Sequence, residues 1–213
     1  MFARGKYRSK TLKLEIVEKS RAFIEQYSTI PIAFDVRECL SAEVLADASN
    51  GTALRPSPVE GPNVKDYDAL PGQRPADWPR RWNLDKWWFA AALDGERYVG
   101  AIAIVMDTVE IAGPRHKPDE AMLWDIRVMP EQRRRGVGRA LLSFAERHAQ
   151  AFGKLYMSAE TQNINVAACR FYARAGYTLQ SVDRFAYPEL PQETQLIWRK
   201  QLGGYADVER NQR

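Results

Sequence analysis

The sequence predicts a single α/β domain built on a central, mostly antiparallel sheet with helices on both faces. Its 213 residues suit one hydrophobic core better than two. Strand-like and helix-like segments alternate along the second half, and no repeat or low-complexity tract interrupts them. Apolar residues make up 45% and charged residues 27% of the chain, as in ordinary globular proteins, which argues against general disorder.

The first half is expected to hold few regular elements. Mostly helical spacing of apolar residues predicts a helix over 10–27, and apolar and β-branched residues predict a strand over 30–37. Residues 51–82 contain six of the twelve prolines and are therefore predicted to form a long loop with sparse regular structure. Loops of this length within a compact domain are usually functional, so we expect this one to contact or cover a substrate.

The second half is more regular. The turn dipeptide Asp94-Gly95 predicts a hairpin between two strand-like runs. Glycines at 136 and 138 begin a predicted helix that ends near Phe152, and Gly176 follows a second one. The predicted strands are 86–93, 98–106, 121–129, 154–160, 177–183 and 192–200; the second helix is 165–175; and the polar end, 203–213, is expected to fray.

Charge and composition exclude several classes of function. The net charge is +4, and much of the excess lies in one run around 133–139, which is more typical of a bound anion than of a nucleic-acid surface. No apolar run approaches the ~20 residues that span a bilayer, and the basic N-terminus lacks the apolar stretch of a secretory signal. Two cysteines with no metal-binding spacing predict neither disulfides nor a metal site, and they favour the cytoplasm.

The segment Arg133-Arg134-Arg135-Gly136-Val137-Gly138 carries the clearest chemistry. It lies between a predicted strand and a predicted helix, so free backbone N–H groups at the helix start would face an anion, and arginines would add charge-assisted contacts. A pyrophosphate fits this arrangement. The segment has neither the G-K-[ST] of a P-loop nor the spacing of a dinucleotide fingerprint. The alternative is a plain helix start with solvated arginines.

Two spaced motifs resemble a known family. They are Arg133-x-x-Gly136-x-Gly138 and Asn165-x-x-Ala168-x-x-Phe171-Tyr172-x-x-x-Gly176-Tyr177. Together they resemble the acetyl-CoA-binding signature of the GCN5-related N-acetyltransferases (GNAT), over about residues 83–202. Glu160-Thr161-Gln162-Asn163 and the region from Asp183 to Leu196 are most similar to the streptothricin acetyltransferase branch of that family.

The resemblance implies a fold and a cosubstrate site. The sheet would splay between two parallel strands, 121–129 and 154–160, and acetyl-CoA would bind at the gap. The glycine loop would hold the pyrophosphate, the preceding strand would pair with the pantetheine arm, and Asn165 would contact that arm. The implied cosubstrate-binding residues are Ile126, Arg127, Val128, Arg133, Arg134, Arg135, Gly136, Val137, Gly138, Arg139 and Asn165.

The catalytic residues follow from the same resemblance and from residue chemistry. Tyr172 matches the family position whose phenol lies near the departing thiolate; the alternative is a core aromatic. Asp125 interrupts an apolar strand, and Glu160 ends the next one. Either carboxylate could deprotonate the substrate amine, directly or through water, and either could instead be structural, with deprotonation left to solvent.

The predicted function is acetyl-CoA-dependent N-acetylation of a small primary amine, such as a streptothricin-like antibiotic. The alternatives are acetylation of a protein amino group and a non-catalytic acyl-CoA-binding module. A homodimer stays open, whereas nucleic acid and membrane are not expected as partners. Four tryptophans, Trp78, Trp82, Trp87 and Trp88, are either core or pocket wall, and burial around a pocket would favour a small acceptor.

Overall fold

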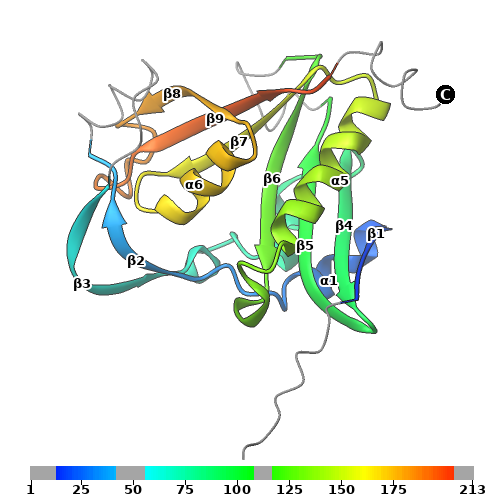
Figure 1. Cartoon of the computed structure of the whole chain (residues 1–213), viewed down its shortest axis with the longest axis horizontal. Coiled ribbons are helices and arrows are strands. Elements are labelled where there is room, and N and C mark those ends of the chain that lie inside the picture. Colours follow the sequence, from blue (N-terminus) through cyan, green and yellow to red (C-terminus); the bar gives the residue numbers. More distant parts are fainter. Residues whose placement is uncertain (1–12, 42–55, 108–116, 204–213) are drawn as a thin grey trace, which may run out of the picture.

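The computed structural model describes residues 13–41, 56–107 and 117–203 and contains a seven-stranded sheet (Figure 1). Every neighbouring pair in it is antiparallel except β6 and β7, which run parallel. The strands lie in the order β1 (Leu14–Lys19), β4 (Trp87–Asp94), β5 (Arg97–Val105), β6 (Glu120–Val128), β7 (Tyr156–Gln162), β9 (Gln195–Gln201) and β8 (Thr178–Asp183). The predicted mixed, mostly antiparallel sheet is confirmed.

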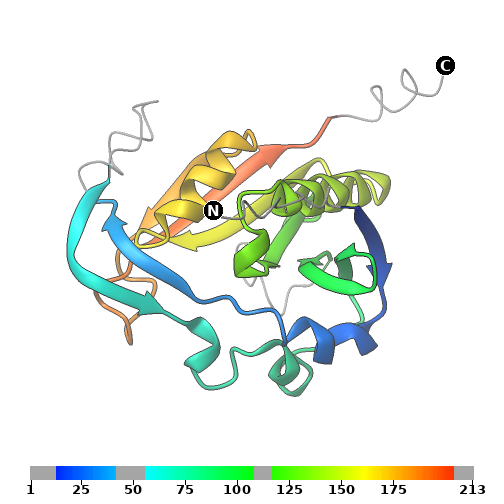
Figure 2. The ribbon, with the colours of Figure 1, turned by 60° about the horizontal axis from the view of Figure 1, so that its bottom comes forward.

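Two longer helices, α5 (Val137–Ala151) and α6 (Val166–Arg174), cover one face of this sheet, as Figure 2 shows. Their apolar sides pack on β4–β7 and β9 in the larger of two buried clusters. Gly100 on β5 permits the close approach of α5, since a Cβ there would lie 3.0 Å from side-chain atoms of Leu141 and Val137. The strands and helices of this half lie within three residues of their predicted bounds.

Short helical turns cover the opposite face of β4 and β5. They are η1 (Arg21–Phe23), α1 (Ile24–Tyr27), η3 (Pro75–Asp77) and α3 (Trp78–Arg81). Their side chains form the second buried cluster with alternate residues of the two strands, Trp87 and Phe89 among them. Helices on both faces are thus observed. None of the described helices is both long and apolar enough to cross a membrane.

The predicted helix over 10–27 is wrong in its first part. Residues 14–19 form β1, an edge strand whose partner is β4, and only 21–27 are helical; residues 10–12 lie outside the described ranges. Because Glu15 and Glu18 are exposed while the residues between them are half-buried, the segment fits a sheet edge as well as a helix face. Pairing with β4 decides between the two.

The predicted long loop over 51–82 also needs correction. Within it, β3 (Ser57–Lys65) pairs antiparallel with β2 (Phe34–Cys39) in a separate two-stranded sheet, and η2 (Tyr67–Ala69) follows. The strand predicted at 30–37 therefore begins later and joins this sheet. The prolines of β3 are compatible with a strand because each strand of a two-stranded sheet has a free edge. Residues 51–55, and 204–213 of the predicted tail, lie outside the described ranges.

Candidate active site

The two parallel strands separate at the centre of the sheet. β6 and β7 pair only where residues Glu120–Leu123 face Tyr156–Ala159, although β6 continues to Val128 and β7 to Gln162. Figure 1 shows them diverging between α5 and α6. Beyond Leu123, no strand in the described ranges pairs with the β7-facing edge of β6. That edge can pair with an extended ligand as a missing strand would.

One extra residue in β6 sets the side-chain directions at this gap. Ala103 of β5 faces Asp125 and Ile104 faces Leu123, so Trp124 has no direct partner and forms a bulge. Leu123 belongs to the core beneath α5, whereas Trp124 packs in the cluster on the opposite face. Asp125 follows Trp124 to that face, where it meets Tyr27. Bulges often redirect side chains in this way next to active sites.

The glycine loop adopts a conformation suited to an anion. Arg134 and Gly136 have positive φ values of 61° and 88°, and Gly136 is the N-cap of α5. The first N–H groups of α5 have no partner within the helix, and the helix dipole makes that end positive. Gly138 lies in the first turn against Phe171 of α6, 3.6 Å from where its Cβ would be. The loop therefore faces the gap between α5 and α6.

The arginines of this loop have different surroundings. Arg133 is tied inward, because its Nε donates to the Val128 carbonyl at 3.0 Å; burial lowers the pKa of its guanidinium. Arg135 donates to Gln132 at 2.7 Å and Arg139 to the Arg174 carbonyl at 3.2 Å. Arg134 is exposed.

A cavity of about 1420 Å³ runs through the splayed gap. Its walls include nine of the eleven residues predicted to bind the cosubstrate: Ile126, Arg127, Val128, Arg133, Arg134, Gly136, Gly138, Arg139 and Asn165. The two others, Val137 and Arg135, do not line it. The Val137 side chain is buried in the core between α5 and the sheet, and Arg135 donates to Gln132. Asn165 caps α6, where its Oδ1 accepts from the Ala168 N–H at 3.1 Å.

Tyr172 fits both sequence-based interpretations, a core aromatic and a phenol at the reaction site, because it is only 5% exposed and also lines the cavity. Burial raises the pKa of its phenol, and the charge of Asp125 adds to the effect. The phenol is therefore protonated at neutral pH and able to donate a proton. The nearby Cys169 is buried, and burial raises the pKa of its thiol to about 12, so it is not a nucleophile at neutral pH.

Asp125 belongs to a buried ionic cluster. Its Oδ1 accepts from the Tyr27 hydroxyl at 2.8 Å and from Arg127 Nε at 3.0 Å. The other end of the Arg127 guanidinium binds both carboxylate oxygens of Asp68, at 2.6 and 2.9 Å. Burial alone would lower the pKa of Arg127, but the two carboxylates outweigh it and raise that pKa. Both carboxylate oxygens of Asp125 are therefore engaged within the cluster.

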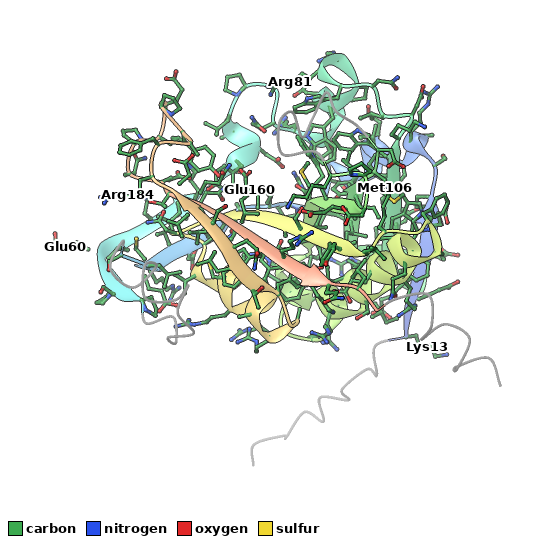
Figure 3. All side chains as sticks on the ribbon, turned by 90° about the horizontal axis from the view of Figure 1, so that it is seen from above. Lys13, Glu60, Arg81, Met106, Glu160 and Arg184 are labelled. Carbon is green, nitrogen blue, oxygen red and sulfur yellow. The ribbon has the colours of Figure 1, made fainter. Side chains whose placement is uncertain are left out.

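Glu160 lies on β7, near the middle of the molecule in Figure 3, and lines the cavity. Its Oε1 accepts from the Tyr187 hydroxyl and its Oε2 from the Gln195 amide, both at 2.7 Å. Burial raises the pKa of Tyr187, with the Glu160 charge as the next cause. Unlike Asp125, Glu160 is exposed. It can therefore meet an incoming amine.

Hydrogen bonds continue from Glu160 to the segment after β3. Tyr187 accepts from the Gln162 amide at 3.0 Å, and the Tyr67 hydroxyl lies 2.9 Å from Gln162 Oε1 and 2.7 Å from Glu193 Oε2. Glu193 is 1% exposed and forms an ion pair with Lys65. The sequence alone assigns no role to Tyr67, Asp68 or Glu193. Spacing gives no signal for them, since Tyr67 and Glu193 lie 126 residues apart.

The tryptophans divide between the two sequence-based interpretations. Trp87 and Trp88 are buried on opposite faces of β4. Trp78 and Trp124 line the cavity, with their rings 6.1 Å apart and nearly perpendicular. Trp82 packs on Trp124 at 4.8 Å behind them. The described residues contain no group of His, Cys, Asp and Glu placed to hold a metal ion.

A splayed parallel pair, an anion-binding helix start and a buried phenol in one cavity define an acyltransferase of the acetyl-CoA-binding type. Comparison with known proteins agrees. The chain belongs to the acetyltransferase (GNAT) family, whose family model matches residues 56–177. The resemblance inferred from the two motifs, and the enzyme class that it implied, are confirmed.

The relatives indicate the branch. Residues of this chain are 37% identical to streptothricin acetyltransferase of Escherichia coli over 83 residues, and 36% identical to streptothricin acetyltransferase A of Bacillus subtilis (strain 168) over 80. These matches cover 38% and 37% of this chain and about half of each relative, 48% and 46%. The similarity to the streptothricin-type branch is thereby confirmed.

Solved structures share the fold. A crystal structure of nourseothricin acetyltransferase superposes with a TM-score of 0.67 at 22% identity, covering 89% of this chain and 99% of that one. A putative streptothricin acetyltransferase from Bacillus anthracis str. Ames, in complex with acetyl coenzyme A, gives 0.64 at 23% identity with the same coverages. The presence of acetyl-CoA in that neighbour agrees with the predicted cosubstrate.

Proposed function

We propose that this protein is an acetyl-CoA-dependent N-acetyltransferase that transfers the acetyl group directly to a primary amine of a small molecule, with streptothricin-like antibiotics as the first candidates. One observation carries the proposal: a single cavity joins the glycine loop, the open edge of β6, Tyr172 and Glu160. Such a cavity brings a thioester and an amine to the same point. The use of acetyl-CoA also favours the cytoplasm as the place of action.

The cosubstrate side is the gap between α5 and α6. The N–H groups at the start of α5 would bind the pyrophosphate, with the exposed Arg134 adding charge. The open edge at 126–128 would pair with the amide groups of the pantetheine arm. The thioester would then lie near Tyr172, at the end of the cosubstrate channel.

The acceptor side supplies the base. Glu160 takes a proton from the ammonium form of the acceptor, directly or through water, and the free amine attacks the thioester carbonyl. A C–N bond forms, the nitrogen of the tetrahedral intermediate loses its second proton to solvent, and the intermediate collapses with cleavage of the C–S bond. Tyr172 gives its phenolic proton to the departing thiolate, and solvent later reprotonates Tyr172. Asp125 is assigned a structural role instead, because its side chain is only 7% exposed and is held by the buried Arg127 guanidinium and Tyr27, whereas Glu160 is exposed.

A small acceptor is favoured over a protein amine by the walls of this side. Trp124 lines it and is backed by the buried Trp78. The segment bearing Tyr67 and Asp68 is held against it by hydrogen bonds to Glu193 and Arg127. The names of the curated relatives point to streptothricin. A peptide substrate would instead need an open groove.

The test is release of free thiol from acetyl-CoA with a panel of amines that includes streptothricin and a lysine-containing peptide. Turnover with streptothricin supports the proposal, turnover with the peptide alone supports protein acetylation, and binding without turnover supports a non-catalytic module. Thermal stabilisation by acetyl-CoA, about 2.7 kcal/mol at 100 Kd, should disappear in Gly136→Asp. An unchanged stabilisation in that variant would place the cosubstrate elsewhere.

The base is tested by pH–rate profiles of Glu160→Gln and Asp125→Asn with the same amine. Glu160→Gln should lower kcat/KM near pH 7 by about 10²-fold and recover partly at high pH, where the amine loses its proton unaided. Asp125→Asn should lower thermal stability and keep the wild-type shape of the profile. Two profiles parallel to the wild type would leave deprotonation to solvent.

A further inference from the structure

The face of β6, β7 and β9 opposite α5 and α6 carries a polar strip beyond the reaction point. Along β7, Met157 and Ala159 lie in the core, so Tyr156, Ser158 and Glu160 face the other way. Across the ladder, Ser158 is paired with Arg199 of β9, and Glu160 with Ile197. The cavity extends over this strip, since Ser158, Ile197 and Arg199 all line it.

Arg199 is held in position on this strip by two neighbours. Its Nε donates to Glu120 Oε2 at 2.8 Å, and its guanidinium carbon lies 3.5 Å from the centre of the Tyr156 ring. These contacts leave Nη1 and Nη2 with no hydrogen-bond partner among the described residues. The side chain is 23% exposed. Lys117 also lies 4.0 Å from Glu120, so the three side chains Arg199, Glu120 and Lys117 together carry one net positive charge.

The position of Arg199 relative to Glu160 follows from the strand register. Ile197 is opposite Glu160, and Arg199 is two residues further along on the same face. Diagonal neighbours of this kind lie about 7–8 Å apart at their Cα atoms. An acceptor whose amine lies at Glu160 can therefore reach the Arg199 guanidinium with a group several bonds from that amine. The two free nitrogens are hydrogen-bond donors in a fixed fork, which matches an acyl oxygen.

We propose that Arg199 determines acceptor specificity by binding a carboxylate or carbonyl oxygen of the acceptor, several bonds from the reacting nitrogen. The proposal rests on the proposed function for the identity of the reacting group. The catalytic residues require only an amine. Binding to Arg199 adds a second requirement, an acyl oxygen at the other end of the acceptor.

The test compares three amines of equal chain length: ε-aminocaproate, its carboxamide and hexylamine. The wild type should show a KM for the first two at least about 10-fold below that for hexylamine, the scale of a hydrogen bond to a charged group. A lower KM for the carboxylate than for the carboxamide would identify a carboxylate as the preferred group, and the reverse a carbonyl. In Arg199→Met this preference should vanish.

Two further variants serve as controls. Lys200→Gln removes one positive charge from the neighbouring residue of β9, which is equally exposed at 23% but pairs with Glu146 on the α5 side. It should keep the wild-type preference. Arg199→Lys keeps the charge without the fork, and it should retain only part of the preference for ε-aminocaproate.

Calorimetric titration of CoA-saturated protein with the same three compounds gives a readout that needs no turnover. If the wild type releases no thiol with any amine tested, the proposed function fails, and the titration still decides the role of Arg199. Equal preferences in the wild type and Arg199→Met, or no preference in the wild type, would overturn the inference in either assay.

Discussion

Replacing Arg127 by methionine should destabilise the protein strongly. The guanidinium is 1% exposed and lies between the carboxylates of Asp125 and Asp68, whose side chains are 7% and 12% exposed. Removing it leaves two carboxylates facing each other with little access to water. Breaking a buried ion pair in this way costs about 3–5 kcal/mol. For a chain of this size the melting temperature should fall by about 6–20 °C.

Urea unfolding at neutral pH measures the loss. Arg97→Met is the control, because Arg97 pairs with Glu131 at the surface, with side chains 57% and 47% exposed, and should cost less than about 1 kcal/mol. Adding Asp68→Asn to Arg127→Met should recover part of the stability, since one uncompensated charge is removed. Similar losses for Arg127→Met and Arg97→Met would refute the reasoning.

Three further outcomes are expected. Tyr172→Phe should lower kcat far more than it weakens acetyl-CoA binding, because the phenolic proton is needed as the thiolate departs. Steady-state kinetics and calorimetry measure the two effects, and full turnover would leave Tyr172 with a packing role only. Gly100→Ala should cost about 1–3 kcal/mol in urea unfolding through its clash with α5, and an unchanged midpoint would contradict that packing. Burial lowers the pKa of His148, with Glu18 opposing, so the unfolded chain binds the proton first as pH falls through about 6.5. Stability should therefore drop more steeply between pH 7 and 5 in the wild type than in His148→Gln, and parallel curves would count against the shift.

Local sequence patterns were enough to predict the helices and strands of the second half of the chain, where most elements pack against elements close to them in sequence. The hairpin around Asp94-Gly95, the helix after Gly136 and the helix ended by Gly176 were all predictable, because turn and cap chemistry specifies them. The proposed cosubstrate side of the site lies in this half. Nine of the eleven residues that spacing and family resemblance assigned to it line the same cavity.

Apart from Glu160, the proposed acceptor side could not be predicted in this way. Residues 14–19 have a pattern compatible with helix or strand, and only β4 decides between them. The prolines of β3 indicated a loop because the separate two-stranded sheet is invisible to local pattern. Asp68 reaches Arg127 across 59 residues, a contact that no short-range signal announces.

The long-range contacts of the acceptor side have a consequence for the order in which the molecule assembles. Lys65 and Tyr67 are joined to Glu193 across 128 and 126 residues, and Glu193 lies two positions before the start of β9, which completes the sheet between β7 and β8. Contacts of such separation form late, after the loops between them have closed. A chain emerging from the ribosome would therefore present the acetyl-CoA side through β7 and α6 while the acceptor pocket still lacked one wall. The proposed acceptor pocket is therefore complete only after β9 has joined the sheet.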